Sequence, residues 1–473
     1  MSAAATATTT GASVGFTTLA HETVVDELPV QGELPAWLSG SLLRTGPAKF
    51  EAGERSMRHW FDGLAMLHRF TLRDGHASYG NRFLHSASYR AAEERGEIAY
   101  PEFATDPCRS LFKRVQSLFA GGPSLSDNGN VNLGRLGERF IAMTETPLPV
   151  EFDPHTLESA SAHPYTAPGH LTTAHPHLDR SSGGMLNYAA KLGLRSEYRF
   201  FLLEPEAAKP RVIASQTVRE PAYMHSFGLT ERWLVLAEFP LVVNPLALAL
   251  SGRPYIENYR WKPERGTRFT LIDRQTGRTG ATLEADACFA FHHVNAFERD
   301  GEVIVDACTY PDASIVEDLY LERLRAGKPI SAASLTRFRL RPDRGEATSE
   351  RLSDWDLELP RIDYGRRNER PYRWVWGVAT GASGFVDDIL KVDTEDGSAR
   401  FWSEPDCYPG EPVFVRRPDG TGEDDGVLLS VVLDGGSERS FLLVLDARDL
   451  QELARAEAPH QIPFGFHGQF ERQ

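Results

Sequence analysis

A strand–turn–strand unit recurs along almost the whole chain, and this repeat limits the folds that the sequence can form. Each unit joins an apolar run to a second run through a polar turn, which is the pattern of a β-hairpin. Seven such units occur, at residues 67–80, 140–159, 198–215, 269–284, 337–352, 389–402 and 442–458. Their spacing of roughly 40–70 residues is typical of four-stranded propeller blades with insertions. The repeat predicts an all-β, seven-bladed β-propeller; a pair of packed sheets, the alternative, does not explain a regular hairpin over the whole length.

The composition is that of one large globular body. The chain has 473 residues, of which 41% are apolar and 25% charged. The first fourteen residues are small and uncharged, which predicts a disordered tail (1–14) before a single folded domain (15–473). The net charge of −15 argues against a nucleic-acid partner, because phosphate binding needs a basic face. Four cysteines without CxxC spacing and without a secretory leader favour a reducing, cytoplasmic setting.

One segment departs from the strand pattern. Residues 106–122 are predicted to form a short basic amphipathic helix, with Arg109, Lys113 and Arg114 beside one apolar face. That face consists of Leu111, Phe112, Val115, Leu118 and Phe119. Either the helix caps the propeller over the metal-bearing face, or it dips into a membrane surface with Cys108 acylated. The apolar stretch Pro240 to Leu250 could widen such a patch, but it is too short to span a bilayer.

Four of the fifteen histidines lie in a distinctive setting. His175, His225, His292 and His467 are each embedded among apolar or aromatic neighbours and are separated by tens of residues or more. A buried neutral imidazole needs a partner for each nitrogen, and a metal ion supplies one. Local zinc-type spacing is absent, so only a circular fold would bring these ligands together. Local pattern alone leaves open which neighbour ligates in the pairs His175/His177 and His292/His293.

Three glutamates interrupt otherwise apolar strands. Glu145, Glu358 and Glu411 lie in the segments AMTETPLP, LELPRID and PGEPVFV. A buried carboxylate is costly without a hydrogen-bonding partner, and a ligating imidazole needs one to orient its second nitrogen. Either these residues form the outer shell of the metal site, or they are three independent solvated edge residues.

These motifs together resemble those of one family. The segments RTGPAKFE, RHWFDGLAMLHRF, DPCRSLF, NVN, MTET, TAHPH, MHSFGLT, FHHVNAFE, EPVFV, EDDGVLLSVV and FHG occur in the order found in carotenoid cleavage oxygenases. The resemblance is to the branch of the animal β-carotene dioxygenases and the retinal pigment epithelium retinoid isomerase, and it covers nearly the whole chain after the tail. Arg180 departs from the family pattern, where many relatives have proline.

The resemblance implies a site and its ligands. It implies one Fe(II) ion per chain on the propeller axis, held by His175, His225, His292 and His467, with Glu145, Glu358 and Glu411 as the second shell. It also implies that the first histidine of each ambiguous pair is the ligand. By motif position, Tyr310 and Phe466 are expected to face a substrate tunnel and Val131 to limit an open iron position.

The resemblance also implies an activity. We expect a non-haem iron dioxygenase that uses O₂ to cleave a C=C double bond of a carotenoid or apocarotenoid into aldehydes, retinal-type if cleavage is central (15,15'). Four imidazoles differ from the two-histidine, one-carboxylate triad and leave two iron positions open. The chain shows no GxGxxG fingerprint after a strand, so no organic redox cofactor is expected. The alternatives are a stilbene-cleaving enzyme or retinoid isomerohydrolase, and a non-catalytic lipid-binding propeller with a structural metal. We expect a cytoplasmic protein, with peripheral membrane contact as the further alternative.

Overall fold

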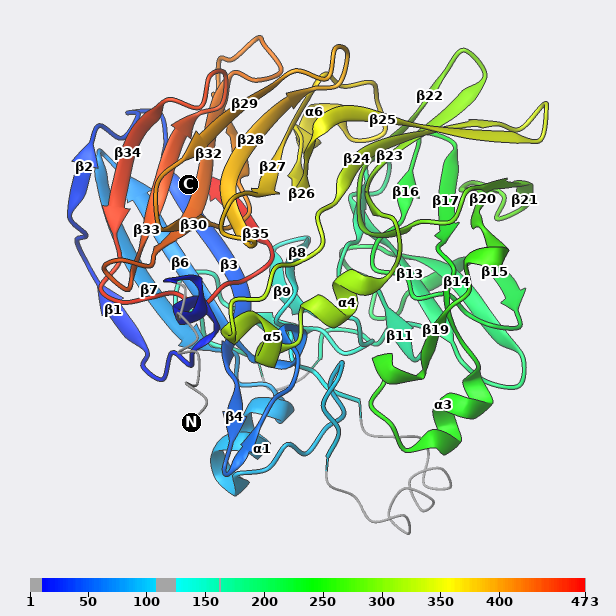
Figure 1. The fold of residues 1–473 in the computed structure, drawn as a ribbon, viewed down its shortest axis with the longest axis horizontal. Coiled ribbons are helices and arrows are strands. Elements are labelled where there is room, and N and C mark those ends of the chain that lie inside the picture. Colours follow the sequence, from blue (N-terminus) through cyan, green and yellow to red (C-terminus); the bar gives the residue numbers. More distant parts are fainter. Residues whose placement is uncertain (1–10, 108–124, 161–162, 473) are drawn as a thin grey trace, which may run out of the picture.

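The protein forms a seven-bladed β-propeller, in agreement with the sequence prediction (Figure 1). The computed structural model describes residues 11–107, 125–160 and 163–472. Each of the seven predicted hairpins supplies two neighbouring antiparallel strands of a different blade. The alternation of apolar runs and polar turns therefore located every blade correctly.

The first three blades consist of the following strands, in their spatial order. Blade 1 contains β1 (Thr23–Val25), β7 (His76–Phe83), β6 (Leu64–Arg73), β3 (Gly40–Lys49) and β35 (Gly468–Arg472). Blade 2 contains β10 (Val150–Phe152), β9 (Arg139–Met143) and β8 (Asn132–Leu136). Blade 3 contains β11 (Leu171–Thr172), β13 (Gly184–Lys191), β14 (Ser196–Leu203) and β15 (Arg211–Val218), with β12 (His177–Asp179) also paired to β13.

The remaining blades follow the same plan. Blade 4 contains β16 (Gly228–Leu229), β17 (Trp233–Glu238), β20 (Thr267–Asp273) and β21 (Thr279–Ala285). Blade 5 contains β22 (Phe289–Arg299), β23 (Glu302–Tyr310), β24 (Ser334–Arg341) and β25 (Glu346–Asp356). Blade 6 contains β26 (Glu358–Arg361), β27 (Trp374–Thr380), β28 (Val386–Asp393) and β29 (Ala399–Ser403). Blade 7 contains β2 (Val30–Gly32), β34 (Glu452–Glu457), β33 (Arg439–Asp446), β32 (Gly426–Asp434) and β30 (Cys407–Pro409), with β31 (Val413–Arg416) also on β32.

The two ends of the chain close the ring. The C-terminal strand β35 pairs with β3 in blade 1, and the N-terminal strand β2 pairs with β34 in blade 7. Each of these two blades thus contains a strand from the opposite end of the sequence. Without this exchange, the sheets of blades 1 and 7 would each lack a strand and its hydrogen bonds. The closure of the ring therefore fixes the positions of residues near both termini.

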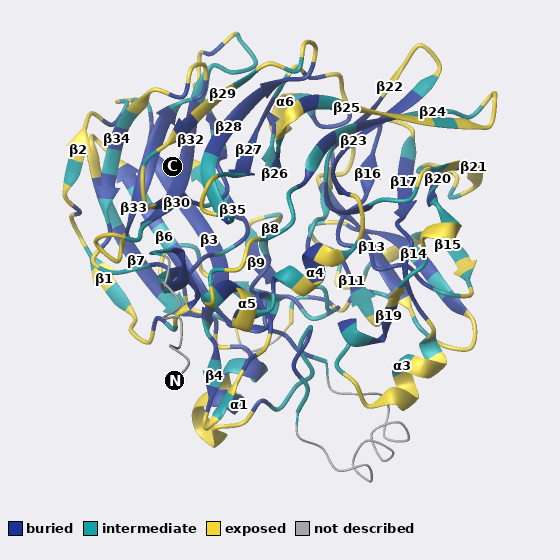
Figure 2. Cartoon of the chain, in the orientation of Figure 1, coloured by how far each residue is buried: buried dark blue, intermediate teal, exposed yellow. Residues whose placement is uncertain are grey.

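Burial follows the position of a strand in its blade (Figure 2). The central strands β32 and β33 are buried along nearly their whole length, whereas β15 and β25 at blade edges alternate between exposed and partly buried residues. This gradient agrees with the sequence, in which the longest uninterrupted apolar runs fall on central strands. The most rigidly packed part of each blade therefore lies away from solvent.

Short helices and two small antiparallel strand pairs lie outside the blades. In the described part of the chain, the α-helices are α1 (Ala87–Arg95), α3 (Pro245–Ser251), α4 (Ser314–Asp318), α5 (Leu321–Arg325) and α6 (Tyr364–Arg367). The 3₁₀ helices are η1 (Gly11–Phe16), η2 (Trp60–Asp62), η3 (Ile256–Asn258) and η4 (Pro263–Arg265). The strand pairs are β4 (Glu51–Ala52) with β5 (Arg55–Ser56), and β18 (Leu241–Val243) with β19 (Tyr259–Trp261). In Figure 1, α1 and α3 lie at the lower edge of the propeller and α6 at its upper edge.

The helix α3 falls in the apolar stretch that the sequence marked only as an insertion. Asn244 caps it by accepting hydrogen bonds from the backbone N–H groups of Leu246 and Ala247, and Pro245 occupies its first turn. An asparagine cap followed by proline is a strong start signal that the apolar run concealed. The helix predicted at about 106–122 lies outside the described residues, apart from residues 106 and 107. Among the described residues no helix is long and apolar enough to cross a membrane.

The boundary of the predicted tail is wrong. Residues 11–14 belong to η1, in which Ala12 and Ser13 are buried. Phe16 anchors this turn by packing edge-on against Trp60, with ring centroids 5.6 Å apart. A Cβ on Gly11 would lie 2.9 Å from the Cα of Gly435. The small residues of this segment thus permit close packing, which composition alone does not distinguish from flexibility.

Candidate metal centre

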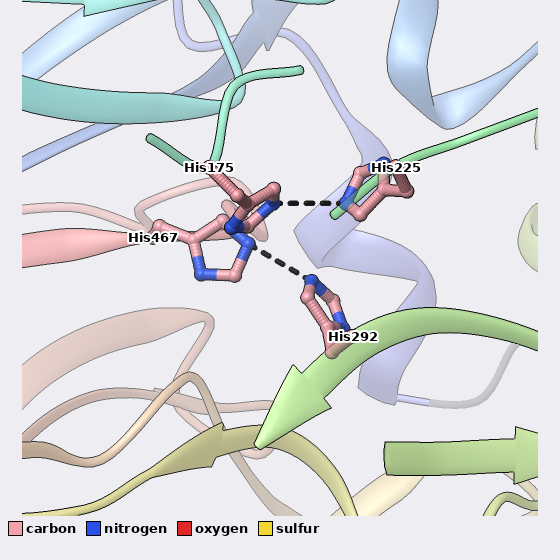
Figure 3. A group of neighbouring side chains, drawn as sticks. All are labelled: His175, His225, His292 and His467. Carbon is pink, nitrogen blue, oxygen red and sulfur yellow. Dashed lines mark hydrogen bonds between the residues drawn. The ribbon is translucent and has the colours of Figure 1, made fainter. Parts of the chain in front are cut away.

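Four histidines from distant parts of the chain meet at one point (Figure 3). One ligand nitrogen from each of His175, His225, His292 and His467 lies within 4.8 Å of every other. They come from blades 3, 4, 5 and 1, either within the inner strand β22 or immediately before the inner strands β12, β16 and β35. The circular arrangement of the blades therefore brings together histidines that are far apart in the sequence.

The two ambiguous pairs are resolved by the structure. His177 points its Nε2 to the backbone carbonyl of Phe227, 3.0 Å away, and its Nδ1 to the hydroxyl of Tyr364. His293 points its Nδ1 to the hydroxyl of Ser226 at 2.8 Å. Neither side chain joins the group of four. The first histidine of each pair does, as the family resemblance implied.

The nitrogen spacing tests whether a metal ion fits. The Nε2 atoms of His175 and His225 are 3.0 Å apart, and those of His292 and His467 are 3.1 Å apart. Two imidazoles bound at about 2.1 Å and at right angles would place their nitrogens about 3.0 Å apart. The observed distances thus suit neighbouring ligands of one first-row metal ion.

The protonation states point the same way. His292 and His467 both direct Nδ1 to a carboxylate, at 2.6 and 2.7 Å, so Nδ1 carries the proton in each ring. Their Nε2 atoms then face each other with lone pairs, and two lone pairs at this distance repel. A cation between them would convert that repulsion into coordination. The donor set therefore fits a divalent metal.

Burial favours the neutral form of three of the imidazoles. It lowers the pKa of His175 well below its usual value, and the other three histidines reinforce this effect. Burial likewise lowers the pKa of His225, and it lowers that of His467 to about 4 even though Glu411 opposes the shift. Neutral rings expose nitrogen lone pairs at physiological pH, which is the state that binds metals.

Each of the three predicted glutamates accepts a hydrogen bond from one of the histidines. Glu145 accepts from His225 Nδ1 at 2.6 Å, Glu358 from His292 at 2.6 Å and Glu411 from His467 at 2.7 Å. They come from blades 2, 6 and 7, so every blade contributes one residue to the four histidines and three glutamates. Among the residues described, His175 has no carboxylate partner. The glutamates orient three of the four rings, as an outer shell would.

Residues that the sequence did not single out support these carboxylates. The Tyr223 hydroxyl donates to Glu145 at 2.7 Å, and the Arg361 guanidinium donates to Glu411 at 2.8 Å. Burial alone would raise the pKa of the Glu411 carboxyl, but Arg361 and His467 outweigh it and hold this pKa well below its usual value. Sequence signals existed, since Tyr223 lies two residues before His225 and Arg361 three after Glu358.

The three predicted tunnel residues occupy different environments. The Tyr310 hydroxyl donates to Glu358 at 3.1 Å, so this side chain supports the outer shell. Phe466 packs on Trp60 with ring centroids 4.5 Å apart. Val131 lies in an apolar cluster with Met143 and Ala174, and Ala174 directly precedes His175 in the chain. A tunnel-facing role for these residues remains a prediction.

An aromatic cluster and a cavity both adjoin the centre. Phe61 packs against His225, Phe291 and Phe466, with ring centroids 6.3, 5.8 and 5.0 Å away. A cavity of about 540 Å³ reaches His175, His292 and His467, and its mixed lining includes apolar side chains as well as His177 and Arg361. None of Val131, Tyr310 and Phe466 lines this cavity. The histidines thus adjoin aromatic rings as well as the cavity.

A propeller with four histidines on its axis defines a class of metal-binding protein, and comparison with known proteins agrees. Residues 16–472 match the family described as "Retinal pigment epithelial membrane protein". Carotenoid isomerooxygenase of Galleria mellonella is 36% identical over 93% of this chain and 92% of its own length. The β,β-carotene 15,15'-dioxygenase of Homo sapiens is 33% identical over 93% of this chain and 91% of its own length. The chain therefore belongs to this family of carotenoid cleavage oxygenases.

Solved structures show the same fold. Cobalt-substituted apocarotenoid oxygenase of Synechocystis superimposes with a TM-score of 0.87 at 27% identity, covering 98% of each chain. The agreement extends over the whole propeller. Its described cobalt substitution shows that the Synechocystis protein accepts a divalent first-row metal.

We predict that replacing His467 by alanine removes the metal. The wild-type chain should hold about one iron, whereas His467→Ala loses one of four nitrogens and leaves the Glu411 carboxylate without its imidazole donor. Iron per chain, measured by elemental analysis on protein whose circular dichroism is native, checks this. The matched control is His177→Ala, which removes a nearby imidazole outside the group of four and should keep its iron. Full iron occupancy in His467→Ala would refute the assignment.

We also predict that the carboxylates of Glu145 and Glu358 strengthen iron binding but are not required for folding. Glu145→Gln keeps the shape of the side chain but removes the charge that orients His225, and should weaken iron affinity or turnover by roughly 10–100-fold. The same change at Glu358 should act through His292. Iron affinity from competition with a chelator provides the measurement, with Glu350→Gln as a surface control. Wild-type iron affinity in both Glu145→Gln and Glu358→Gln would show that these carboxylates do not affect metal binding.

Proposed function

We propose that this protein is a non-haem Fe(II) dioxygenase that cleaves a C=C double bond of a carotenoid or apocarotenoid to give two aldehydes. The observation that carries the proposal is the convergence of four imidazoles, three of them buried, with no carboxylate among the ligand atoms. When bound there, Fe(II) would supply the redox chemistry by which O₂ reacts with an alkene. Both oxygen atoms would end in the products, one in each aldehyde, so no further reductant is consumed.

The chain's own residues would prepare this chemistry. Glu145, Glu358 and Glu411 hold the Nδ1 protons of three histidines, which leaves Nε2 free as the ligand atom. The relatives named above act on carotenoids, and an extended polyene suits aromatic walls. The cluster of Phe61, Phe291 and Phe466 provides such a wall beside His225 and excludes water from it.

The particular substrate within this class can be tested directly. We expect Fe(II)-loaded protein to convert β-carotene or an apocarotenal into aldehydes, retinal among them if the central 15,15' bond is cut. Under ¹⁸O₂, with immediate reduction of the products to alcohols to prevent exchange with water, each fragment should carry one labelled oxygen. Chromatography with mass spectrometry measures both. His467→Ala serves as the inactive control.

Other outcomes would identify the alternatives. Labelled benzaldehydes from a hydroxystilbene, with no turnover of carotenoids, would indicate a stilbene-cleaving enzyme. Isomerised retinol from a retinyl ester without O₂ consumption would indicate an isomerohydrolase. Saturable binding of β-carotene without any product from the iron-loaded chain would indicate a non-catalytic lipid-binding propeller.

We further propose peripheral membrane contact through α3, by a chain otherwise located in the cytoplasm. Carotenoids partition into lipid, so an entrance at a bilayer would spare them a passage through water. No residue of α3 is buried, and Leu246 and Leu250 are 55% and 78% exposed. The basic side chains of Arg253, Arg260 and Lys262 line a hollow next to this helix. The predicted face from Leu111 to Phe119 lies outside the described residues.

The double variant Leu246→Asp, Leu250→Asp should lose binding to liposomes without losing stability, because both side chains are already solvated. Co-sedimentation with vesicles, beside melting temperatures, measures both properties. Val24→Asp is the matched control, since Val24 is 75% exposed on β1, at the opposite side of the propeller from α3 in Figure 1. Equal sedimentation of the double variant and the wild type would exclude α3 as the contact.

A further inference from the structure

Arg44 places a buried positive charge at the seam between blades 1 and 7. It belongs to β3 and is only 6% exposed. Its Nη2 donates a long hydrogen bond of 3.4 Å to the carbonyl of Phe466, and its Nη1 is buried without a hydrogen-bond partner. Within the described parts of the chain, no carboxylate forms an ion pair with this guanidinium. The charge is therefore uncompensated by direct contact.

Such an arrangement is unfavourable unless something else is bound. Burial lowers the pKa of Arg44, but a guanidinium does not lose its proton in proteins, so the charge persists. Glu411 is near enough to raise this pKa in part. However, the oxygens of Glu411 already accept from His467, the Gly468 backbone and Arg361. A buried charge without a partner destabilises the folded state.

A small cavity lies against the guanidinium. Its volume of about 20 Å³ is enough for one particle the size of a water molecule. The lining residues come from β3, β6, the end of β30, β32 and the segment before β35; they are Arg44, Thr45, Gly46, His68, Gly410, Val431, Leu433, Ile462, Pro463, Phe464 and Gly465. None of them carries a carboxylate. His68 is neutral, because burial lowers its pKa to about 3.

Two glycines keep this space open. A Cβ on Gly410 would lie 3.3 Å from Nη1 and 3.2 Å from Nη2 of Arg44, and a Cβ on Gly465 would lie 3.7 Å from Nη2. Neither glycine has a positive φ, so backbone conformation does not require glycine there. The absence of side chains instead leaves room beside the donor groups of Arg44.

We propose that this cavity is a binding site for one monovalent anion of halide size, chloride under ordinary conditions. The only formal charge among the lining residues is that of Arg44, so the site selects against cations. A water molecule would satisfy the free N–H groups but would leave the charge unbalanced. Larger anions such as phosphate exceed the available volume.

The anion would stabilise the closure of the ring next to the metal centre. Arg44 contacts both residues that flank His467: its Nη2 reaches the Phe466 carbonyl, and its Cγ fills the place of a side chain on Gly468, 2.6 Å from where a Cβ would be. Since β35 begins at Gly468, neutralising Arg44 would hold β3 and β35 together where the two chain ends pair. The site thus lies outside the histidine ligands but behind one of them.

Crystals of the wild-type protein grown in bromide test the proposal directly. We expect an anomalous difference peak within hydrogen-bonding distance of Arg44 Nη1, inside the cavity. In solution, the melting temperature should rise by about 1–2 °C for each tenfold increase in chloride or bromide above saturation, relative to gluconate at the same ionic strength. Gluconate is too large for the cavity and controls for general salt effects.

Two variants separate the site from other halide effects. Gly410→Ala fills the space beside the guanidinium but keeps Arg44, and should lose the difference between halide and gluconate. Gly193→Ala is the matched control, since its Cβ would meet only the Arg195 carbonyl at 4.0 Å, and it should keep the difference. Arg44→Met should also be insensitive to halide; if it fails to fold, Gly410→Ala still decides.

The contrary results are equally definite. Density for water alone, without an anomalous peak, would overturn the proposal. So would a halide dependence that persists unchanged in Gly410→Ala. A bromide peak in the crystal without any thermal dependence at millimolar halide would identify an adventitious ion only.

Discussion

The repulsion between facing imidazole lone pairs at the propeller axis is the constraint around which the site is arranged. His292 and His467 face each other through unprotonated Nε2 atoms 3.1 Å apart, because glutamates hold the protons on the opposite sides of both rings. Such a contact is unfavourable until a cation lies between the rings. The carboxylates in turn are supported by tyrosine hydroxyls or by Arg361. Each layer thus orients the one inside it, since these supporting groups hold the carboxylates and the carboxylates hold the imidazoles.

The histidines and glutamates of the candidate metal centre come together only when the ring of blades is closed. All seven blades contribute one residue to the histidines and glutamates, so an open ring would leave the set incomplete. The seam is the critical place, because His467 directly precedes the C-terminal strand β35, which completes blade 1. Arg44 packs against the same seam from β3. A perturbation at the chain ends would therefore reach His467 through the backbone, without any direct contact to the other histidines.

An aromatic cluster and a cavity meet at the centre. Phe61, Phe291 and Phe466 form an apolar, aromatic wall, which suits a conjugated hydrocarbon. The cavity that reaches the histidines has a mixed lining, which includes Leu178 as well as Arg361. In the activity proposed here, an extended alkene and dioxygen, both apolar, must meet at one point. The aromatic wall and the cavity both adjoin the histidines where the two reactants would meet.

The hairpin repeat, the residue types at the centre and the family were all readable from the sequence, because alternation of apolar residues and ordered motifs are local properties of the chain. Local pattern did not distinguish His175 from His177 or reveal the partners of the glutamates, because these contacts join residues 50 to 80 positions apart or more. The same limit hid the packing of residues 11–14, which the sequence assigned to a tail although Ala12 and Ser13 are buried. The sequence by itself determined which strands form and which side chains carry the chemistry. Only the closed ring decided which of those side chains meet, since ligand distances, neutral imidazoles and the unpaired charge of Arg44 arise from burial between blades that are remote in the chain.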